Sequence, residues 1–151
     1  LCSAIAATAS KDLIQSRGHK VEGIDVFPII VSDDVESISK ATEMSKLLES
    51  LKLMNDVKRL EARKPRTGKS SLRGRSKKVG KSVLFVTKDS SKIAKACGVF
   101  PGVEVKAVKD LSVLDLAPGS DPIRLTVYSK AALEEIAKIK STHLEVMVKV
   151  R

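Results

Sequence analysis

The chain has 151 residues, the length of one domain with room for a buried core, and a formal net charge of +10. Aromatic residues make up 3% and Trp is absent, which argues against a protein that stacks single-stranded bases on aromatic rings. We find no apolar run of membrane-spanning length and no signal-peptide pattern, and therefore expect a cytosolic protein.

Two amphipathic helices and one short strand are predicted in the first sixty residues. The first helix is marked by small and apolar residues at helical spacing, namely Cys2, Ile5, Ala6, Ala9 and Leu13. Gly18 ends this pattern. A second apolar stripe covers residues 41–51 and continues to Leu60. Between the helices, the apolar run 27–31 contains Pro28, which is typical of a strand start or a sheet edge.

The net charge is concentrated in the segment that follows the second helix. Residues 58–81 contain eleven of the 28 basic residues and one of the 18 acidic residues. The rest of the chain therefore has equal numbers of basic and acidic residues. Pro65, Gly68, Gly74 and Gly80 predict that residues 63–81 form a loop and not a regular helix. One cationic loop on a neutral body favours a domain that binds a polyanion at one place; a solvated basic loop or a localisation signal is the alternative.

Strands and helices alternate in the second half of the chain. The apolar run 83–86 is typical of a central parallel strand, and residues 103–107 and 125–128 predict two more strands. A helix through Ile93, Ala96 and Cys97 is expected after the first of these strands, and another helix after the last. Leu144, Val146, Val148 and Val150 alternate with polar or flexible residues, which predicts a C-terminal strand over 144–150. We predict one α/β domain, residues 1–151, with a mostly parallel sheet of about five strands and helices on both faces.

Two short segments resemble the end of a nucleotide-binding Walker loop. They are Thr67-Gly68-Lys69-Ser70 and Gly80-Lys81-Ser82. Arg63 and Arg75 stand where that motif requires glycine, and Ser82 begins a strand where the motif requires a helix. We therefore do not expect nucleotide hydrolysis.

The other candidate residues for chemistry are isolated. His19 and His143 have no partner at a catalytic spacing, so a surface or structural role is expected. Cys2 and Cys97 each fall on the apolar face of a predicted helix and are expected to be buried, and no zinc-ligand spacing exists. The acidic pair 33–34 follows a strand, where α/β enzymes place carboxylates, but acids equally favour a helix N-terminus. We expect no enzyme, catalytic residue, metal, cofactor or small-molecule substrate.

The basic loop has the residues needed to bind a phosphate backbone. In Arg73-Gly74-Arg75 the glycine lets the backbone approach RNA while both guanidinium groups bind phosphates in bidentate fashion. Gly68 beside Lys69 repeats the arrangement with a point charge, and such loops are often disordered until they bind. We predict RNA contacts from Arg63, Lys64, Arg66, Gly68, Lys69, Arg73, Gly74, Arg75, Lys77, Lys78 and Lys81.

Seven segments occur in the order of one known family. They are Leu1–Ala9 with Arg17-Gly18-His19, Pro28–Asp34, Arg66–Arg75, Ser82–Asp89, Pro101-Gly102-Val103, Leu116–Gly119 and Arg124–Val127. Together they resemble the second half of ribosomal protein L four, the universal large-subunit family, in its archaeal and eukaryotic form. The resemblance covers about residues 1–140.

The resemblance implies a structural protein of the large ribosomal subunit in the cytoplasm, without catalysis. Its implied partners are the rRNA of that subunit and neighbouring large-subunit proteins, with no membrane. The family's rRNA-contacting residues fall on Arg66, Gly68, Lys69, Arg73, Gly74, Arg75, Lys77 and Lys78. Arg17 and Arg124 also match, and a structural role is open for both. The alternatives are a non-ribosomal RNA-binding or ribosome-assembly module on the same fold and, third, a small phosphate-binding α/β enzyme.

The sequence departs from the family in three places. Ser70-Ser71 stand where the family has further Gly or Lys, which predicts fewer contacts there. The family's first helix and its arginine-rich loop toward the peptide exit tunnel are absent before Leu1, so no tunnel role is assigned. Residues 147–151 resemble the family's first strand, which suggests a circular permutation; an ordinary C-terminal extension is the alternative.

Overall fold

The computed structural model describes residues 1–77, 80–121 and 123–138. The four strands are β1 (Ile29–Val31), β2 (Leu84–Thr87), β3 (Glu104–Ala107) and β4 (Thr126–Ser129). The α-helices are α1 (Cys2–Ala7), α2 (Lys11–Ser16), α3 (Ala41–Ser50), α4 (Met54–Glu61), α5 (Lys69–Leu72), α6 (Ile93–Cys97), α7 (Val113–Leu116) and α8 (Lys130–Lys138). Three short 3-10 helices are η1 (Asp33–Ser37), η2 (Val108–Asp110) and η3 (Pro118–Ser120).

The described strands form one fully parallel sheet in the order β1-β4-β2-β3. All residues of β2 and β4 are buried, as expected for central strands covered on both faces. The α/β class and the parallel sheet are thus confirmed, with four strands in place of about five. The fifth expected strand, 144–150, lies outside the described residues.

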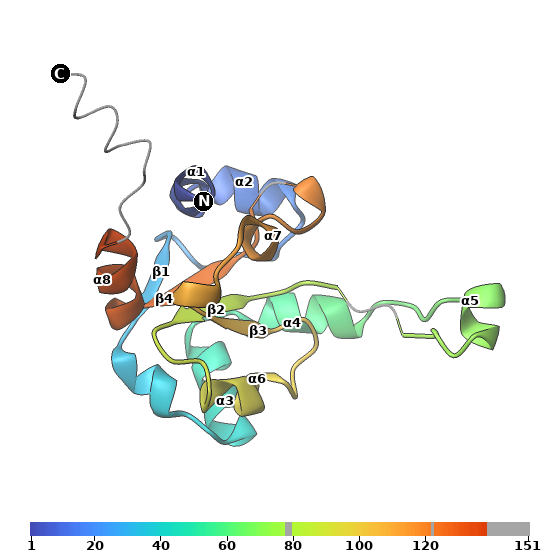
Figure 1. Ribbon diagram of the computed structural model, residues 1–151. Coiled ribbons are helices and arrows are strands. Elements are labelled where there is room, and N and C mark those ends of the chain that lie inside the picture. Colours follow the sequence, from blue (N-terminus) through green and yellow to red (C-terminus); the bar gives the residue numbers. More distant parts are fainter. Residues whose placement is uncertain (78–79, 122, 139–151) are drawn as a thin grey trace.

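Helices cover both faces of the sheet, as Figure 1 shows. On one face, Met44 and Leu48 of α3 and Ile93 of α6 pack with Phe85 and Val127 from the central strands. On the other face, Leu116 of α7 and Ala132 of α8 pack against the central strands. Their partners there are Leu84, Val86 and Tyr128. The two clusters make a three-layer core.

The first predicted helix is interrupted, and Cys2 at its start is exposed. The chain leaves the helix at Thr8, whose hydroxyl donates to the Ile5 carbonyl (2.6 Å), and restarts at Lys11. The restart turns α2, so Ile14 is buried and Leu13 is exposed. Cys2 is exposed as well, contrary to the prediction from one continuous helix.

The other cysteine follows the prediction. Cys97 is buried on α6, and desolvation raises the pKa of its thiol to about 12. A thiol with so high a pKa stays protonated at neutral pH and behaves as a small apolar side chain.

Candidate nucleic-acid interface

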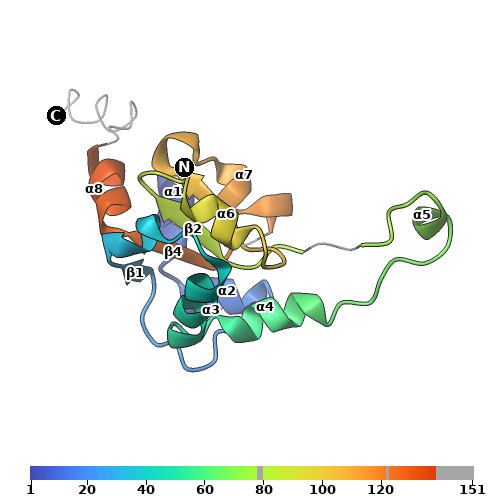
Figure 2. The same ribbon diagram turned by 90° about the horizontal axis from the view of Figure 1, so that it is seen from below.

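The basic segment projects from the body as one long arm. Residues 62–77 leave the C-terminus of α4 and residues 80–81 lead into β2, with α5 at the far tip (Figures 1 and 2). Every described residue from 61 to 77 is exposed, including Leu72 at 87%. We call residues 62–81 the basic hairpin. The exposure of residues 62–77 lets their cations contact a partner on both sides of the hairpin.

Hydrogen bonds order the tip of the basic hairpin. Arg66 N donates to the Ser76 carbonyl (2.8 Å) and joins its two strands. Gly68 and Gly74, at φ 68° and 72°, bracket the single turn α5, and Arg75 N donates to the Ser70 carbonyl (2.9 Å). The tip thus adds one helical turn to the loop that the sequence predicts. Glycine permits both reversals because left-handed φ costs it nothing.

The structure brings most of the predicted RNA-contact residues together on this arm. They are Arg63, Lys64, Arg66, Gly68, Lys69, Arg73, Gly74, Arg75 and Lys77, all exposed. Lys78 lies outside the described residues. Lys81 differs from the others because it lies where the hairpin enters the body and its ammonium group forms an ion pair with Glu104.

A buried carboxylate holds the two ends of the basic hairpin together. Asp56, on α4, accepts hydrogen bonds from Ser82 Oγ (2.6 Å), His19 Nδ1 (3.0 Å) and Arg59 Nε (2.9 Å). Arg59 also donates to the Lys81 carbonyl (3.4 Å). The helix before the hairpin is thereby tied to the strand after it.

The same cluster assigns His19 a structural role. Leu125 N donates to His19 Nε2 (3.5 Å), so the ring proton lies on Nδ1 and is donated to Asp56. Burial alone would raise the pKa of Asp56, but hydrogen bonds from His19, Arg59 and Ser82 outweigh it and hold the pKa well below its usual range. The carboxylate stays charged, and His19 is a buried partner of it. His143 lies outside the described residues.

A second buried charge fixes the strand that follows the hairpin. Arg124 is fully buried and donates to the carbonyls of Ser82 (2.6 Å) and Gly102 (2.7 Å) and to Glu104 Oε2 (2.6 Å). Partial burial opposes ionisation of Glu104, but hydrogen bonds from Lys81 and Arg124 lower its pKa. Arg124 is therefore a structural residue, one of the two roles left open by the sequence.

Arg17 lies at the edge of the body. Its guanidinium donates to the carbonyls of Pro118 (2.7 Å) and Asp121 (3.1 Å). These bonds tie α2 to the connection between α7 and β4, which is a structural role as well.

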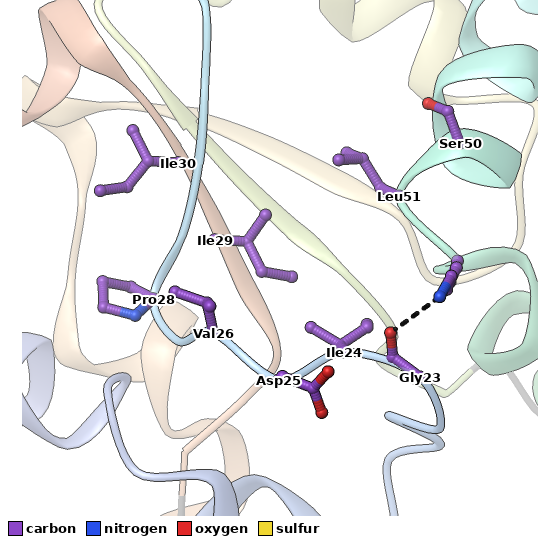
Figure 3. Close-up of a pocket in the computed structure, with 10 residues that line it drawn as sticks. Gly23, Ile24, Asp25, Val26, Pro28, Ile29, Ile30, Ser50 and Leu51 are labelled. Carbon is purple, nitrogen blue, oxygen red and sulfur yellow. Dashed lines mark hydrogen bonds between the residues drawn. The ribbon is translucent and has the colours of Figure 1, made fainter.

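A hollow beside β1 lacks the groups of an active site. It has a volume of about 450 Å³ and is lined by Gly23–Val26, Pro28–Ile30 and Ser50–Lys52 (Figure 3). Its two charged residues have other partners: Asp25 pairs with Lys11 (3.8 Å) and Lys52 donates to the Gly23 carbonyl (3.2 Å). The remaining lining is mostly apolar.

Two other kinds of feature are absent from the described residues. No three His, Cys, Asp or Glu side chains come together there as metal ligands would. None of the helices in the described part of the chain has the length and hydrophobicity of a membrane span.

Comparison with known proteins supplies the family. Residues 1–139 match the pattern of the ribosomal protein L4/L1 family. The chain belongs to this family. The resemblance seen in the sequence is therefore confirmed over the segments that carried it.

Comparison with archaeal members of the family shows what share of their length this chain spans. The chain is 43% identical over 140 residues to large ribosomal subunit protein uL4 of Sulfurisphaera tokodaii, covering 91% of this chain and 52% of that protein. It is 46% identical over 136 residues to uL4 of Pyrobaculum aerophilum, covering 89% and 48%. It is 40% identical over 136 residues to uL4 of Haloarcula marismortui, covering 90% and 54%. The chain spans about half the length of these relatives.

Proposed function

We propose that this chain is the rRNA-binding part of a structural constituent of the large ribosomal subunit. The observation that carries the proposal is the basic hairpin, a projecting arm whose described cations are exposed on a body of balanced charge. The relatives that carry the name large ribosomal subunit protein support the ribosomal setting. Neighbouring large-subunit proteins are the further partners, the cytoplasmic ribosome is the location, and no catalysis is assigned.

The chemistry of the arm favours contacts to backbone and shape. Arginine forks bind phosphate oxygens in two parallel hydrogen bonds, and the glycines beside them let the chain approach closely. Folded RNA is recognised largely through phosphate, 2′-hydroxyl and shape contacts, which need no aromatic platform. An arm of this length can enter a groove between RNA helices that a flat surface cannot enter.

The test compares two quadruple variants with equal loss of charge. One replaces Arg66, Lys69, Arg73 and Arg75 with Ala; the control replaces Lys20, Lys46, Lys95 and Lys109, which are exposed on the body. We expect wild type and control to bind large-subunit rRNA with a log–log salt slope near −5, if about six phosphates are neutralised. The hairpin variant should lose tight binding with little change in Tm.

Two outcomes would overturn the proposal. Equal loss in both variants would mean that net charge, not the hairpin, carries the binding. A salt slope near zero for the wild type would exclude a phosphate interface. Co-sedimentation with large subunits at moderate salt then separates a ribosomal protein from a non-ribosomal RNA-binding module.

A further inference from the structure

The carboxyl ends of β2 and β4 lie where open α/β sheets bind ligands. β2 is followed by α6, whose side chains join the core on one face, whereas β4 is followed by α8, whose side chains join the core on the other. The connections after these two neighbouring strands therefore run to opposite sides of the sheet. Ligands of open α/β sheets bind at such a switch point. We call the residues there, 87–89 and Ser129, the β2–β4 junction.

A carboxylate of the chain itself occupies the β2–β4 junction. Glu36, on η1, accepts hydrogen bonds at Oε1 from Lys88 N (2.8 Å) and Ser129 Oγ (2.7 Å). Its Oε2 accepts from Asp89 N at 3.4 Å. Two consecutive backbone N–H groups and a hydroxyl thus surround one oxyanion, the donor arrangement that proteins use for phosphate.

The hydroxyl is held in place for this task. Ser129 is 1% exposed, and its Oγ accepts a hydrogen bond from Ala132 N (3.1 Å) in the first turn of α8. Its proton is therefore available to Glu36. Thr87 precedes the two backbone donors and is also 1% exposed, and its hydroxyl has no partner among the described residues. The junction thus combines a directed buried donor with an unpaired buried hydroxyl.

The neighbouring charges do not share this donor set. Asp33 accepts from Ala131 N (2.8 Å), Asp89 Oδ1 accepts from Ser91 N (3.0 Å), and Lys88 Nζ pairs with Glu135 (3.7 Å). Each of these groups has a partner of its own, so Glu36 acts as the ligand of the junction.

We infer that the β2–β4 junction is an oxyanion-binding site that the chain fills with its own Glu36 carboxylate. While Glu36 is in place, free phosphate and nucleotide phosphates are excluded. When the carboxylate is removed, inorganic phosphate takes its position on Lys88 N, Asp89 N and Ser129 Oγ. The inference is independent of RNA binding, because the basic hairpin is a different part of the molecule.

The test is a phosphate titration of the full chain carrying Glu36→Ala, at constant ionic strength maintained with chloride. We expect saturable shifts of the Lys88 and Asp89 amide resonances in Glu36→Ala, and none in the wild type. At free phosphate about ten times its Kd, the unfolding constant of this variant should fall about tenfold. The control is Glu43→Ala on the exposed face of α3, which should respond as the wild type does.

A second variant covers the case in which Glu36→Ala does not fold. Glu36→Gln keeps the size and one acceptor oxygen but turns an amide group toward a backbone donor, so its internal ligand is weaker. It should be less stable than the wild type and should show the same amide shifts at higher phosphate. Absence of amide shifts in the folded variant, or equal shifts in the wild type, overturns the inference.

Discussion

At the scale of single residues, Asp56 determines how the basic hairpin joins the body. Its carboxylate is fully buried and accepts from side chains on three segments, His19, Arg59 and Ser82. A buried charge with all its partners present is tolerated, but removing the charge leaves several donors unpaired. The base of the arm is therefore a polar cluster that should be sensitive to substitution.

Replacing Asp56 with Asn should reduce the free energy of unfolding by about 2–4 kcal/mol, because His19, Arg59, Ser82 and the backbone N of Lys20 lose a charged acceptor. Urea unfolding measures this loss. Since the folded-state pKa of Asp56 is depressed, its contribution is present above the unfolded-state pKa of about 4 and declines as the pH falls below it. The difference between wild type and variant should therefore shrink on acidification from about pH 5.

The exposed Asp110 provides the control for this experiment. Asp110→Asn removes one carboxylate that lies on the surface, so it should change stability by less than about 0.5 kcal/mol. A wild-type-like stability of Asp56→Asn at neutral pH, or a difference that does not depend on pH, would contradict the role given to Asp56.

The sequence could predict the exposed residues of the interface but not this buried cluster. Basic residues separated by Gly and Pro are visible as a pattern, and nine of the eleven predicted contact residues lie in the exposed part of the arm between residues 63 and 77. His19, Asp56 and Ser82 are far apart in the chain, with no motif spacing between them. They meet because the sheet brings the start of β2 beside α4, which is a tertiary effect.

At the scale of elements, two glycines show where the hairpin base is tightly packed. Gly74, at the tip, has a positive φ and open space where a Cβ would lie. Gly102, before β3, has a similar φ, but a Cβ there would contact Leu60 Cδ1 and lie 2.6 Å from the Gly80 carbonyl oxygen. An alanine would strain the backbone at both positions. At Gly102 its Cβ would also collide with neighbouring atoms, whereas at Gly74 it would not.

Gly102→Ala should therefore destabilise the fold clearly more than Gly74→Ala. The tip variant should lose about 1–2 kcal/mol at most, from left-handed φ alone. In Gly102→Ala, Leu60 and the chain entering β2 must also be displaced. We therefore expect this variant to lose a further free energy of unfolding of about 1–3 kcal/mol. Chemical denaturation of the two variants measures both numbers. Equal stabilities would mean that the base of the hairpin can relax freely.

The exposed arm should also be the first place cut by trypsin. The described part of the arm has one large apolar side chain, Leu72, and it is exposed. Outside the tip, one backbone hydrogen bond between described residues, from Arg66 N to the Ser76 carbonyl, joins the two sides of the arm. We expect mass spectrometry to find early cleavage between residues 63 and 81 in the free protein and protection in the rRNA complex. Cleavage at Lys92, on the body, serves as the control and should be unaffected by RNA. Equal resistance of the arm with and without rRNA would contradict a binding role.

Helix boundaries were the part of the secondary structure that the sequence predicted least well. The apolar stripe from 41 to 60 is broken at Lys52, whose φ is 57°, so α3 and α4 change direction there. The break lets Leu53 and Val57 enter the same core as Leu48. Hydrophobic periodicity marks the apolar residues correctly but cannot show where tertiary packing interrupts the helix.

At the scale of the whole molecule, alternation of strands and helices predicted a parallel sheet but not its order. The order β1-β4-β2-β3 follows once the helices are assigned to faces, because parallel crossovers are right-handed. α6 lies on one face and leads from β2 outward to β3. α7 and α8 lie on the other face, where a right-handed crossover moves in the opposite direction across the sheet.

This topology leaves one place for a strand that follows α8. The position next to β4 in the required direction is already taken by β1, so a parallel strand after α8 must lie on the outer side of β1. No strand of the described residues pairs with that side, and Ile30 and Val26 beside it are 51% and 75% exposed. The apolar hollow of Figure 3 adjoins the same edge. We therefore expect residues 144–150, with their alternating aliphatic side chains, to pair in parallel with β1.

Deleting residues 141–151 should then reduce the free energy of unfolding by several kcal/mol, because each fully buried aliphatic side chain contributes about 1.5–3 kcal/mol. Hydrogen exchange should show slow amides between 145 and 149 in the full chain. Val148→Asp should act like the deletion, whereas Lys149→Asp, on the opposite face of the expected strand, should cost less than about 1 kcal/mol. If those amides exchange as in an unfolded peptide and the deletion is harmless, the edge of β1 is free and the permuted strand is excluded.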